Sequence, residues 1–187
     1  HEPAGTPERL AEVRKALDAL SATWQEGVLL REGALVVLSG VPNAGKSTLF
    51  NAMLGILRSI VTEIPGTTRD SIEETMILNG IPLRMVDTAG LRETDSSIEK
   101  LGVDRAVKLV RNADLNLRLI DLAEKAGPQL DWMTSGTYNP DKTIVVLSRA
   151  DLAREGSVET LPRQIQAAGY EVVVLSVKED RGLGDLK

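Results

Sequence analysis

The 187-residue chain is predicted to fold as an α/β domain in which a mostly parallel central sheet carries helices on both faces. Short apolar runs recur along the chain with helical patterns between most of them, and this alternation is typical of parallel sheets. The first of these runs leads through a glycine-rich loop straight into a helix. We therefore assign residues 33–187 to the α/β domain and residues 1–32 to a separate N-terminal helical segment.

An amphipathic helix is expected over about residues 8–26, and Thr6 followed by Pro7 is a suitable start for it. Its apolar residues recur at steps of three and four and so form one stripe, Leu10, Val13, Leu17, Leu20 and Trp24. Such a stripe has to be buried against some surface. The partner is either the α/β domain itself or a surface in another part of the molecule.

The strands of the sheet are predicted from six apolar runs, at residues 34–40, 74–79, 82–87, 115–121, 143–148 and 170–176. The first run precedes a helix at 46–55. The run 115–121 is unusual because Asn116 and Arg118 share one face, where a central parallel strand normally carries apolar residues on both faces. The sequence offers no explanation for this polar face.

The composition excludes several functional classes. A net charge of −5 has the wrong sign for a domain whose whole surface binds nucleic acid, so we expect no direct DNA binding and only local RNA contact. The absence of cysteine excludes disulfides and thiolate metal sites and is compatible with a cytoplasmic location. No apolar run approaches the roughly 20 residues that cross a bilayer, so no membrane association is expected.

Residues 40–47, GVPNAGKS, match the pattern G-x-x-x-x-G-K-[ST] between a buried strand and a helix. In this arrangement, backbone N–H groups and the helix dipole bind the phosphates of a nucleotide. Lys46 is predicted to reach the outer phosphates and to assist catalysis, and Ser47 to ligate magnesium. The predicted nucleotide contacts of this loop are Asn43, Ala44, Gly45, Lys46, Ser47 and Thr48.

Two further segments are predicted to contact the phosphates. Asp87 ends a strand in DTAG, so it can hold magnesium through a water while the Gly90 N–H meets the γ-phosphate, and Thr88 and Ala89 lie between them. Between this motif and the glycine-rich loop, the segment IPGTTRD (64–70) has two hydroxyls suited to a switch segment, which is ordered by γ-phosphate and magnesium. Thr68 is the predicted second magnesium ligand, and the nucleotide contacts of the loop are Thr62, Glu63, Ile64, Pro65, Gly66, Thr67 and Thr68.

The base is predicted to bind at SRAD (148–151), which follows the run at 143–148 where guanine-binding GTPases have Asn-Lys-x-Asp. Asp151 can accept hydrogen bonds from the N1–H and amino group of guanine, both of which adenine lacks. Ser148 is too short to make the hydrogen bonds of asparagine, whereas the stem of Arg149 can cover the base as lysine would. The loop after the last strand supplies Ser176, Val177 and Lys178, where guanine-binding GTPases have a Ser-Ala-Lys loop.

From about residue 33 to residue 187, these motifs resemble the P-loop GTPases of the translation-factor class, which have a Ras-like G domain. The segments PNAGKS, GTTRD and DTAGLRETDSSIEKLGVDRA (87–106) resemble the MnmE (TrmE) family, and QEGVLLREG (25–33) is similar to the end of its helical-domain segment. The resemblance implies that the chain is a fragment of a longer protein. It also implies that the N-terminal helix is a remnant of the helical domain in which the G domain is inserted.

The resemblance further implies a mechanism. Leu91 stands where Ras-like enzymes have the water-positioning glutamine, and by resemblance Glu99 takes that role. A potassium ion replaces the arginine finger, held by Asn43, Thr62, Ile64 and Thr67. The implied cofactors are GTP or GDP, Mg²⁺ and K⁺.

In the family, two G domains dimerise through their switch faces when nucleotide is bound. The resemblance implies that the full-length protein works with a partner, MnmG, on the wobble uridine of tRNA. Two alternatives stay open at this point. One is a ribosome-assembly GTPase of the Der type, which shares PN-x-GKS and GTTRD, and the other is a nucleotide-binding scaffold with little turnover.

Overall fold

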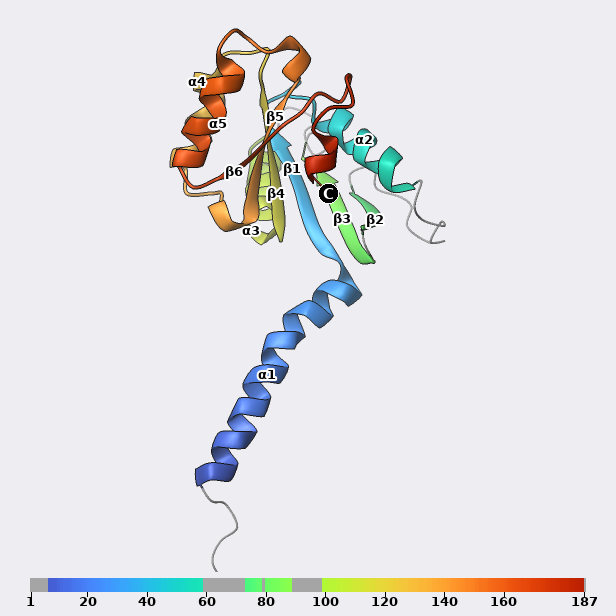
Figure 1. The fold of residues 1–187 in the computed structure, drawn as a ribbon, viewed down its shortest axis with the longest axis vertical. Coiled ribbons are helices and arrows are strands. Elements are labelled where there is room, and N and C mark those ends of the chain that lie inside the picture. The colour runs from blue at the N-terminus through green and yellow to red at the C-terminus, as the bar shows by residue number, and fades with distance from the viewer. Residues whose placement is uncertain (1–6, 59–72, 79, 89–98, 187) are drawn as a thin grey trace, which may run out of the picture.

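The computed structural model describes residues 7–58, 73–78, 80–88 and 99–186 of the chain (Figure 1). Six strands form one sheet in the order β2-β3-β1-β4-β5-β6. Five of them run parallel, and β2 pairs antiparallel with β3. The strands are β1 (Ala34–Gly40), β2 (Glu73–Leu78), β3 (Ile81–Asp87), β4 (Leu115–Asp121), β5 (Thr143–Ser148) and β6 (Glu171–Val174). This sheet confirms the predicted fold class.

Helices cover both faces of the sheet. They are α2 (Lys46–Arg58), α3 (Glu99–Asn112), α4 (Ala126–Leu130) and α5 (Ser157–Ala167), joined by short 3₁₀ turns at Asp131–Thr134, Pro140–Lys142, Ala150–Leu152 and Leu183–Leu186. Every strand from β1 to β5 was expected at or within one residue of its observed bounds. Only β6 is shorter than its apolar run, because the chain turns after Val174 to form the loop at 176–181.

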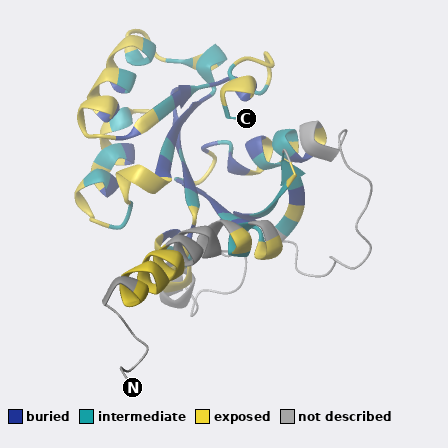
Figure 2. Cartoon of the chain, turned by 60° about the horizontal axis from the view of Figure 1, so that its bottom comes forward, coloured by how far each residue is buried: buried dark blue, intermediate teal, exposed yellow. Residues whose placement is uncertain are grey.

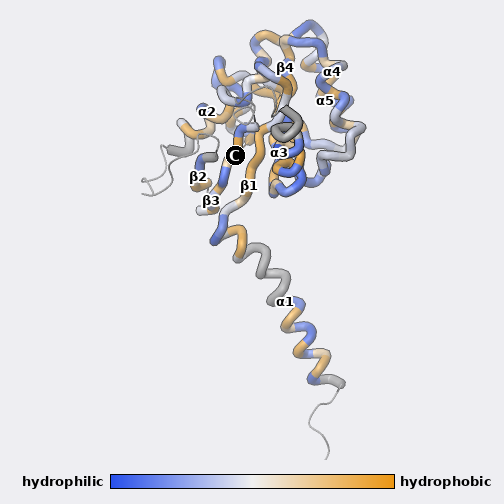
Figure 3. The backbone as a smooth tube through the Cα atoms, turned by 180° about the vertical axis from the view of Figure 1, so that it is seen from behind, coloured by the Kyte–Doolittle hydropathy of each residue, from blue (hydrophilic) through white to orange (hydrophobic). Residues whose placement is uncertain are grey.

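Alternate residues of the central strands face two separate cores. Leu38 of β1 and Leu117 of β4 pack with Leu49 of α2 on one face. On the other face, Val37 packs with Val110 of α3. The tube of β1 is orange along most of its length in Figure 3, as expected for a strand that is buried on both faces. This two-sided burial explains why the strands read as continuous apolar runs in the sequence.

The polar face of β4 is accounted for by its neighbours. The Asn116 amide donates to the carbonyl oxygen of Val110 at 3.1 Å. The Arg118 guanidinium carbon lies 5.4 Å from the ring centroid of Trp132 and 5.3 Å from that of Tyr138, so that two aromatic faces cover the cation. The Tyr138 hydroxyl in turn donates to Ser39 Oγ at 3.0 Å. This polar layer therefore extends to the residue that precedes the glycine-rich loop.

The N-terminal helix, α1 (Pro7–Glu32), is longer than expected and extends away from the sheet (Figure 1). Gly33 closes it by donating its N–H to the Leu29 carbonyl at 3.0 Å. The described part of the apolar stripe is exposed, with Leu10 at 68%, Val13 at 56% and Leu17 at 60% (Figure 2). These three side chains therefore do not pack on the α/β domain. Among the described residues, no helix is both long and apolar enough to cross a membrane.

Candidate nucleotide-binding site

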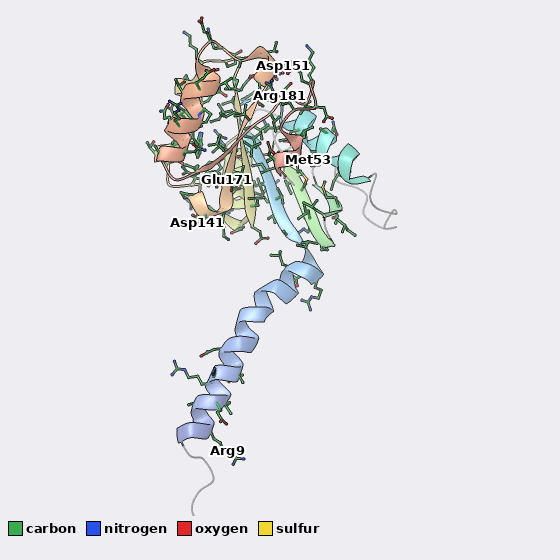
Figure 4. The ribbon with its side chains drawn as sticks, in the orientation of Figure 1. Arg9, Met53, Asp141, Asp151, Glu171 and Arg181 are labelled. Atoms are coloured by element: carbon green, nitrogen blue, oxygen red, sulfur yellow. The ribbon has the colours of Figure 1, made fainter. Side chains whose placement is uncertain are left out.

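The glycine-rich loop lies at the carboxyl end of the parallel strands, the end of the sheet remote from α1 (Figure 4). It begins at Gly40, the last residue of β1, and leads to Lys46, the first residue of α2. Gly40 has φ +156°, and a Cβ there would lie 2.8 Å from the Leu119 carbonyl oxygen, so only glycine fits against β4. The first N–H groups of α2 have no acceptor within the helix and favour an anion at this point.

Lys46 is 5% exposed, and its ammonium group is held within the loop itself. Nζ donates to the carbonyl oxygens of Val41 at 2.8 Å and Gly40 at 3.2 Å. The side chain lines a cavity of about 410 Å³ bounded by Gly40, Pro42, Asn43, Gly45, Lys46, Ser47, Thr48, Thr88 and Arg149. A positive charge and helix N–H groups thus converge on a hollow large enough for phosphates.

The structure brings Ser47, the predicted magnesium ligand of this cavity, into contact with Asp87, which is predicted to hold the ion through a water. Ser47 Oγ donates to Asp87 Oδ2 at 2.8 Å. Asp87 is placed by the parallel register of β1 and β3, in which it pairs with Leu38. The next residue, Thr88, is fixed to the same strand, since its N–H and its hydroxyl both donate to the Leu38 carbonyl oxygen, at 3.2 and 2.9 Å.

A second cavity of about 160 Å³ adjoins the first. The two share the lining residues Gly45, Thr48 and Arg149. The rest of the smaller cavity is formed by Leu49, Ser148, Asp151, Leu152, Leu175, Val177 and Lys178. All the predicted base-binding residues except Ser176 therefore line one hollow beside the glycine-rich loop.

Asp151 is held as an anion at this second cavity. The Ser176 hydroxyl donates to its Oδ1 at 2.6 Å, and the Lys178 ammonium lies 3.9 Å from its Oδ2. The hydrogen bond from Ser176 is the main reason that the pKa of Asp151 is lowered below its ordinary value, and burial opposes this shift. Asp151 and Arg181 are labelled at the same end of the sheet in Figure 4. Ser176 thus contributes to the cavity by orienting Asp151.

Ser148 connects the end of β5 to the glycine-rich loop. It is 4% exposed, and its hydroxyl donates to the Ala44 carbonyl oxygen at 2.7 Å. The Ile120 carbonyl oxygen lies 3.2 Å from the same hydroxyl. The short side chain therefore ties the end of β5 to the backbone of the glycine-rich loop.

Arg149 has a left-handed backbone, with φ 56° and ψ 44°, which is uncommon for a residue other than glycine. Its guanidinium NH1 lies 2.8 Å from Asp121 Oδ2, and the Asp121 side chain is only 2% exposed. Asp121 Oδ1 also accepts from the Ala123 N–H at 2.9 Å. Sequence reasoning did not single out Asp121, although it ends a parallel strand as Asp87 does.

The predicted residues Thr62, Glu63, Ile64, Pro65, Gly66, Thr67, Thr68, Ala89 and Gly90 lie outside the described residues. Glu99 is described only as the first residue of α3. Leu49 and Leu175 were also missed as cavity residues. They are core residues next to motif positions, and nothing in an apolar pattern distinguishes a leucine that lines a cavity from one that does not.

Comparisons with known proteins agree with this geometry. Residues 35–149 match the family model described as 50S ribosome-binding GTPase. The chain is 38% identical over 180 residues to the tRNA modification GTPase MnmE of Bacillus subtilis and 44% identical over 170 residues to that of Syntrophotalea carbinolica. These matches cover 96% and 91% of the chain but only 39% and 36% of the relatives, so the chain spans about two fifths of their length.

Among solved structures, the chain is similar to a point variant of Aquifex aeolicus Era bound to GDP and AlF₄⁻. The TM-score is 0.61 at 29% identity, over 82% of this chain and 54% of that one. The family model covers more than half of the chain, including the glycine-rich loop and the strands β1 to β5. The chain therefore belongs to this GTPase family, as a GTP-hydrolysing P-loop domain that corresponds to the G domain of MnmE.

Proposed function

We propose that the two adjoining cavities bind a single guanine nucleotide, with its phosphates at Lys46 and its base at Asp151. The observation that carries this proposal is that the cavities share Gly45, Thr48 and Arg149, so one ligand can occupy both. Lys46 and the first turn of α2 supply the positive potential for the phosphates. Arg149 extends along both cavities and covers the base with its aliphatic stem.

Selectivity for guanine follows from the charge state of Asp151. Its lowered pKa keeps it ionised at neutral pH, so both oxygens are acceptors only. Guanine offers N1–H and an amino group to these oxygens. Adenine offers neither on that edge and leaves the carboxylate unpaired, which is costly. The domain therefore binds GDP in preference to ADP.

The test is competition between GDP and ADP for the wild-type protein and for Asp151→Asn. Hydrogen bonds to a charged acceptor are stronger than those to a neutral one, so Asp151→Asn should weaken GDP binding by roughly 10- to 100-fold. Asp141→Asn is the matched control, because Asp141 is exposed at the opposite end of β5 (Figure 4). Equal competition by ADP would show that Asp151 does not read the base.

We propose that magnesium binds with GTP at Ser47, and that Asp87 holds the ion through a water. Two oxygen side chains in contact beside the phosphate cavity fit the preference of Mg²⁺ for oxygen ligands. The ion would neutralise charge on the phosphates. Thr68 is the proposed second protein ligand, and the Gly90 N–H is the proposed donor to the γ-phosphate. Lys46 holds the outer phosphates in line for attack by water.

We further propose that hydrolysis is stimulated by potassium, which supplies a positive charge where other GTPases use an arginine. Asn43 supports this proposal, because it lines the phosphate cavity with a left-handed backbone at φ 64°. Thr62, Ile64 and Thr67 are the other proposed ligands, and Glu99 is the proposed group that orients the water. The two G domains of a homodimer would enclose this site through their switch faces.

The deciding measurement is GTP hydrolysis in potassium and in sodium buffer, for the wild type and for Glu99→Ala. We expect faster turnover in potassium, and a large loss of turnover in Glu99→Ala while GDP binding is retained. Equal rates in the two salts would exclude the potassium mechanism. Bound nucleotide without any turnover would favour the scaffold alternative instead. Sedimentation with GDP and aluminium fluoride, in each salt, tests the dimer.

In its full-length context, we propose that this domain serves modification of the wobble uridine of tRNA together with MnmG. The support is that the relatives from Bacillus subtilis and Syntrophotalea carbinolica are tRNA modification GTPases. The exposed stripe of α1 then belongs against the helical domain of the longer protein. Replacing the G domain of the Bacillus subtilis relative with residues 33–187 should preserve modified uridine in tRNA. Loss of the modification with GTPase activity intact would favour a Der-type role.

A further inference from the structure

We propose that this site does not read N7 of the guanine base, so that it binds guanine nucleotides altered at N7 as tightly as GDP itself. The inference rests on the proposed function, in which the base occupies the smaller cavity. It is carried by Ser148, the residue at the end of β5 that stands between the base cavity and the glycine-rich loop.

The hydrogen of the Ser148 hydroxyl is already engaged. A serine hydroxyl has one hydrogen to donate, and here it points to the Ala44 carbonyl oxygen at 2.7 Å, with the Ile120 carbonyl oxygen at 3.2 Å. The side chain is 4% exposed, so the bond to Ala44 is shielded from water. Only the lone pairs of Oγ remain for a ligand.

The base presents its five-membered ring to this side of the cavity. In the anti conformation of a nucleotide, C8 and N7 lie on the same side as the 5′-phosphates. The phosphates lie at Lys46, and the two cavities meet at Gly45. The N7 edge of the base therefore faces Gly45 and Ser148, while the N1 edge faces Asp151 on the far side.

N7 of guanine is a hydrogen-bond acceptor, and Ser148 offers it only another acceptor. Leu49 and Leu175 flank this part of the cavity and carry no donor, and Thr48, which also lines the phosphate cavity, is assigned to the phosphates. The guanidinium of Arg149, which borders the cavity, is held by Asp121 at 2.8 Å. Recognition of the base thus depends on the N1 edge, and changes at N7 remove no hydrogen bond.

The predicted ligand class is therefore guanine nucleotides in which N7 is replaced or masked. The probe is 7-deaza-GDP, in which a C–H group replaces N7 and the N1 edge is unchanged. The dissociation constants of GDP, 7-deaza-GDP and ADP are measured by calorimetry with magnesium. For the wild type, we expect the constants of 7-deaza-GDP and GDP to agree within about twofold, since a lost hydrogen bond would typically cost about fivefold.

Ser148→Asn provides the converse test. The amide adds donors at the N7 edge, so it should tighten binding of GDP but not of 7-deaza-GDP. The dissociation constant of 7-deaza-GDP should then be roughly fivefold larger than that of GDP. Ser148→Ala should leave the ratio near one. Ser157→Asn is the matched control, because Ser157 also donates to a carbonyl but lines neither cavity and should not change the ratio.

Wild-type protein that binds 7-deaza-GDP at least about fivefold more weakly than GDP would overturn the inference, since some donor would then read N7. The wild-type ratio alone decides this, even if Ser148→Asn fails to fold. Failure of the proposed function gives a different result. In that case GDP does not bind at all, or ADP binds as tightly as GDP. Neither result depends on how the dissociation constants of GDP and 7-deaza-GDP compare.

Discussion

Gly182 offers the sharpest test of how the base-binding loop is built. This loop, residues 176–181, is closed by two backbone hydrogen bonds of 3.0 Å between Ser176 and Arg181. Gly182 follows it with φ +78°. A Cβ at this position would overlap the Val174 carbonyl oxygen and lie 3.1 Å from Leu175 Cα. Both obstacles are backbone atoms of β6 and its extension, which cannot rotate away.

Gly182→Ala should therefore destabilise the domain by two additive effects. A left-handed backbone costs a residue other than glycine about 1–2 kcal/mol. Overpacking against backbone costs about 1–3 kcal/mol more. The sum is about 2–5 kcal/mol, which for a chain of 187 residues corresponds to a fall in Tm of roughly 10 °C.

Thermal unfolding followed by circular dichroism measures this change, and a GDP titration of the folded protein measures its functional effect. GDP binding should weaken as well, because movement of Leu175 displaces Ser176 from Asp151. Gly184→Ala is the matched control, since a Cβ there meets no atom within 4 Å. If Gly182→Ala melts within about 2 °C of the wild type, the loop is less tightly fixed than we infer.

Two further predictions concern the charges around the base cavity. Asp121→Asn keeps the acceptor for the Ala123 N–H but removes the charge that holds Arg149, so unfolding free energy should fall by about 1 kcal/mol and GDP affinity by about threefold. Unchanged affinity would show that Arg149 does not need this anchor. Ser176→Ala removes the main cause of the lowered pKa of Asp151, which should rise in a carbon-detected NMR titration, whereas an unchanged pKa would contradict that assignment.

The pH dependence that follows from Asp151 has a definite sign. Because its folded-state pKa is lowered, ionised Asp151 contributes its full stabilisation above its unfolded pKa of about 4. The contribution is lost as the pH falls through the lower folded-state pKa. In Ser176→Ala, the folded-state pKa of Asp151 moves closer to its unfolded-state pKa. The contribution of Asp151 to stability therefore becomes smaller at every pH above about 4.

The fold and the positions of the main motifs were predictable because they depend on local patterns. Apolar runs that are buried on both faces gave β1, β4 and β5 at their observed bounds. The spacing of Gly40, Gly45, Lys46 and Ser47 identified the phosphate cradle, since strand, loop and helix are contiguous in the chain. The placement of Asp87 at the end of β3 and of Asp151 in the turn after β5 also followed, because parallel strands end at a common edge.

The contacts that connect these motifs were decided only by the tertiary structure. Ser39, Arg118 and Tyr138 form one polar layer because the register of β1 and β4 places Ser39 beside Arg118, and a later turn brings Tyr138 over both. No sequence pattern encodes such a pairing between segments so far apart in the chain.

The same holds for the base cavity, which lies between the start of α2 and the segments that follow β5 and β6. The sequence alone showed that Ser148 is too short to replace asparagine. The structure showed that the Ser148 hydroxyl donates its hydrogen to the Ala44 carbonyl oxygen. It likewise showed that Arg149 is anchored by the buried Asp121. Residue types determine which groups can donate or accept, whereas the packing of distant strands determines which partners they meet.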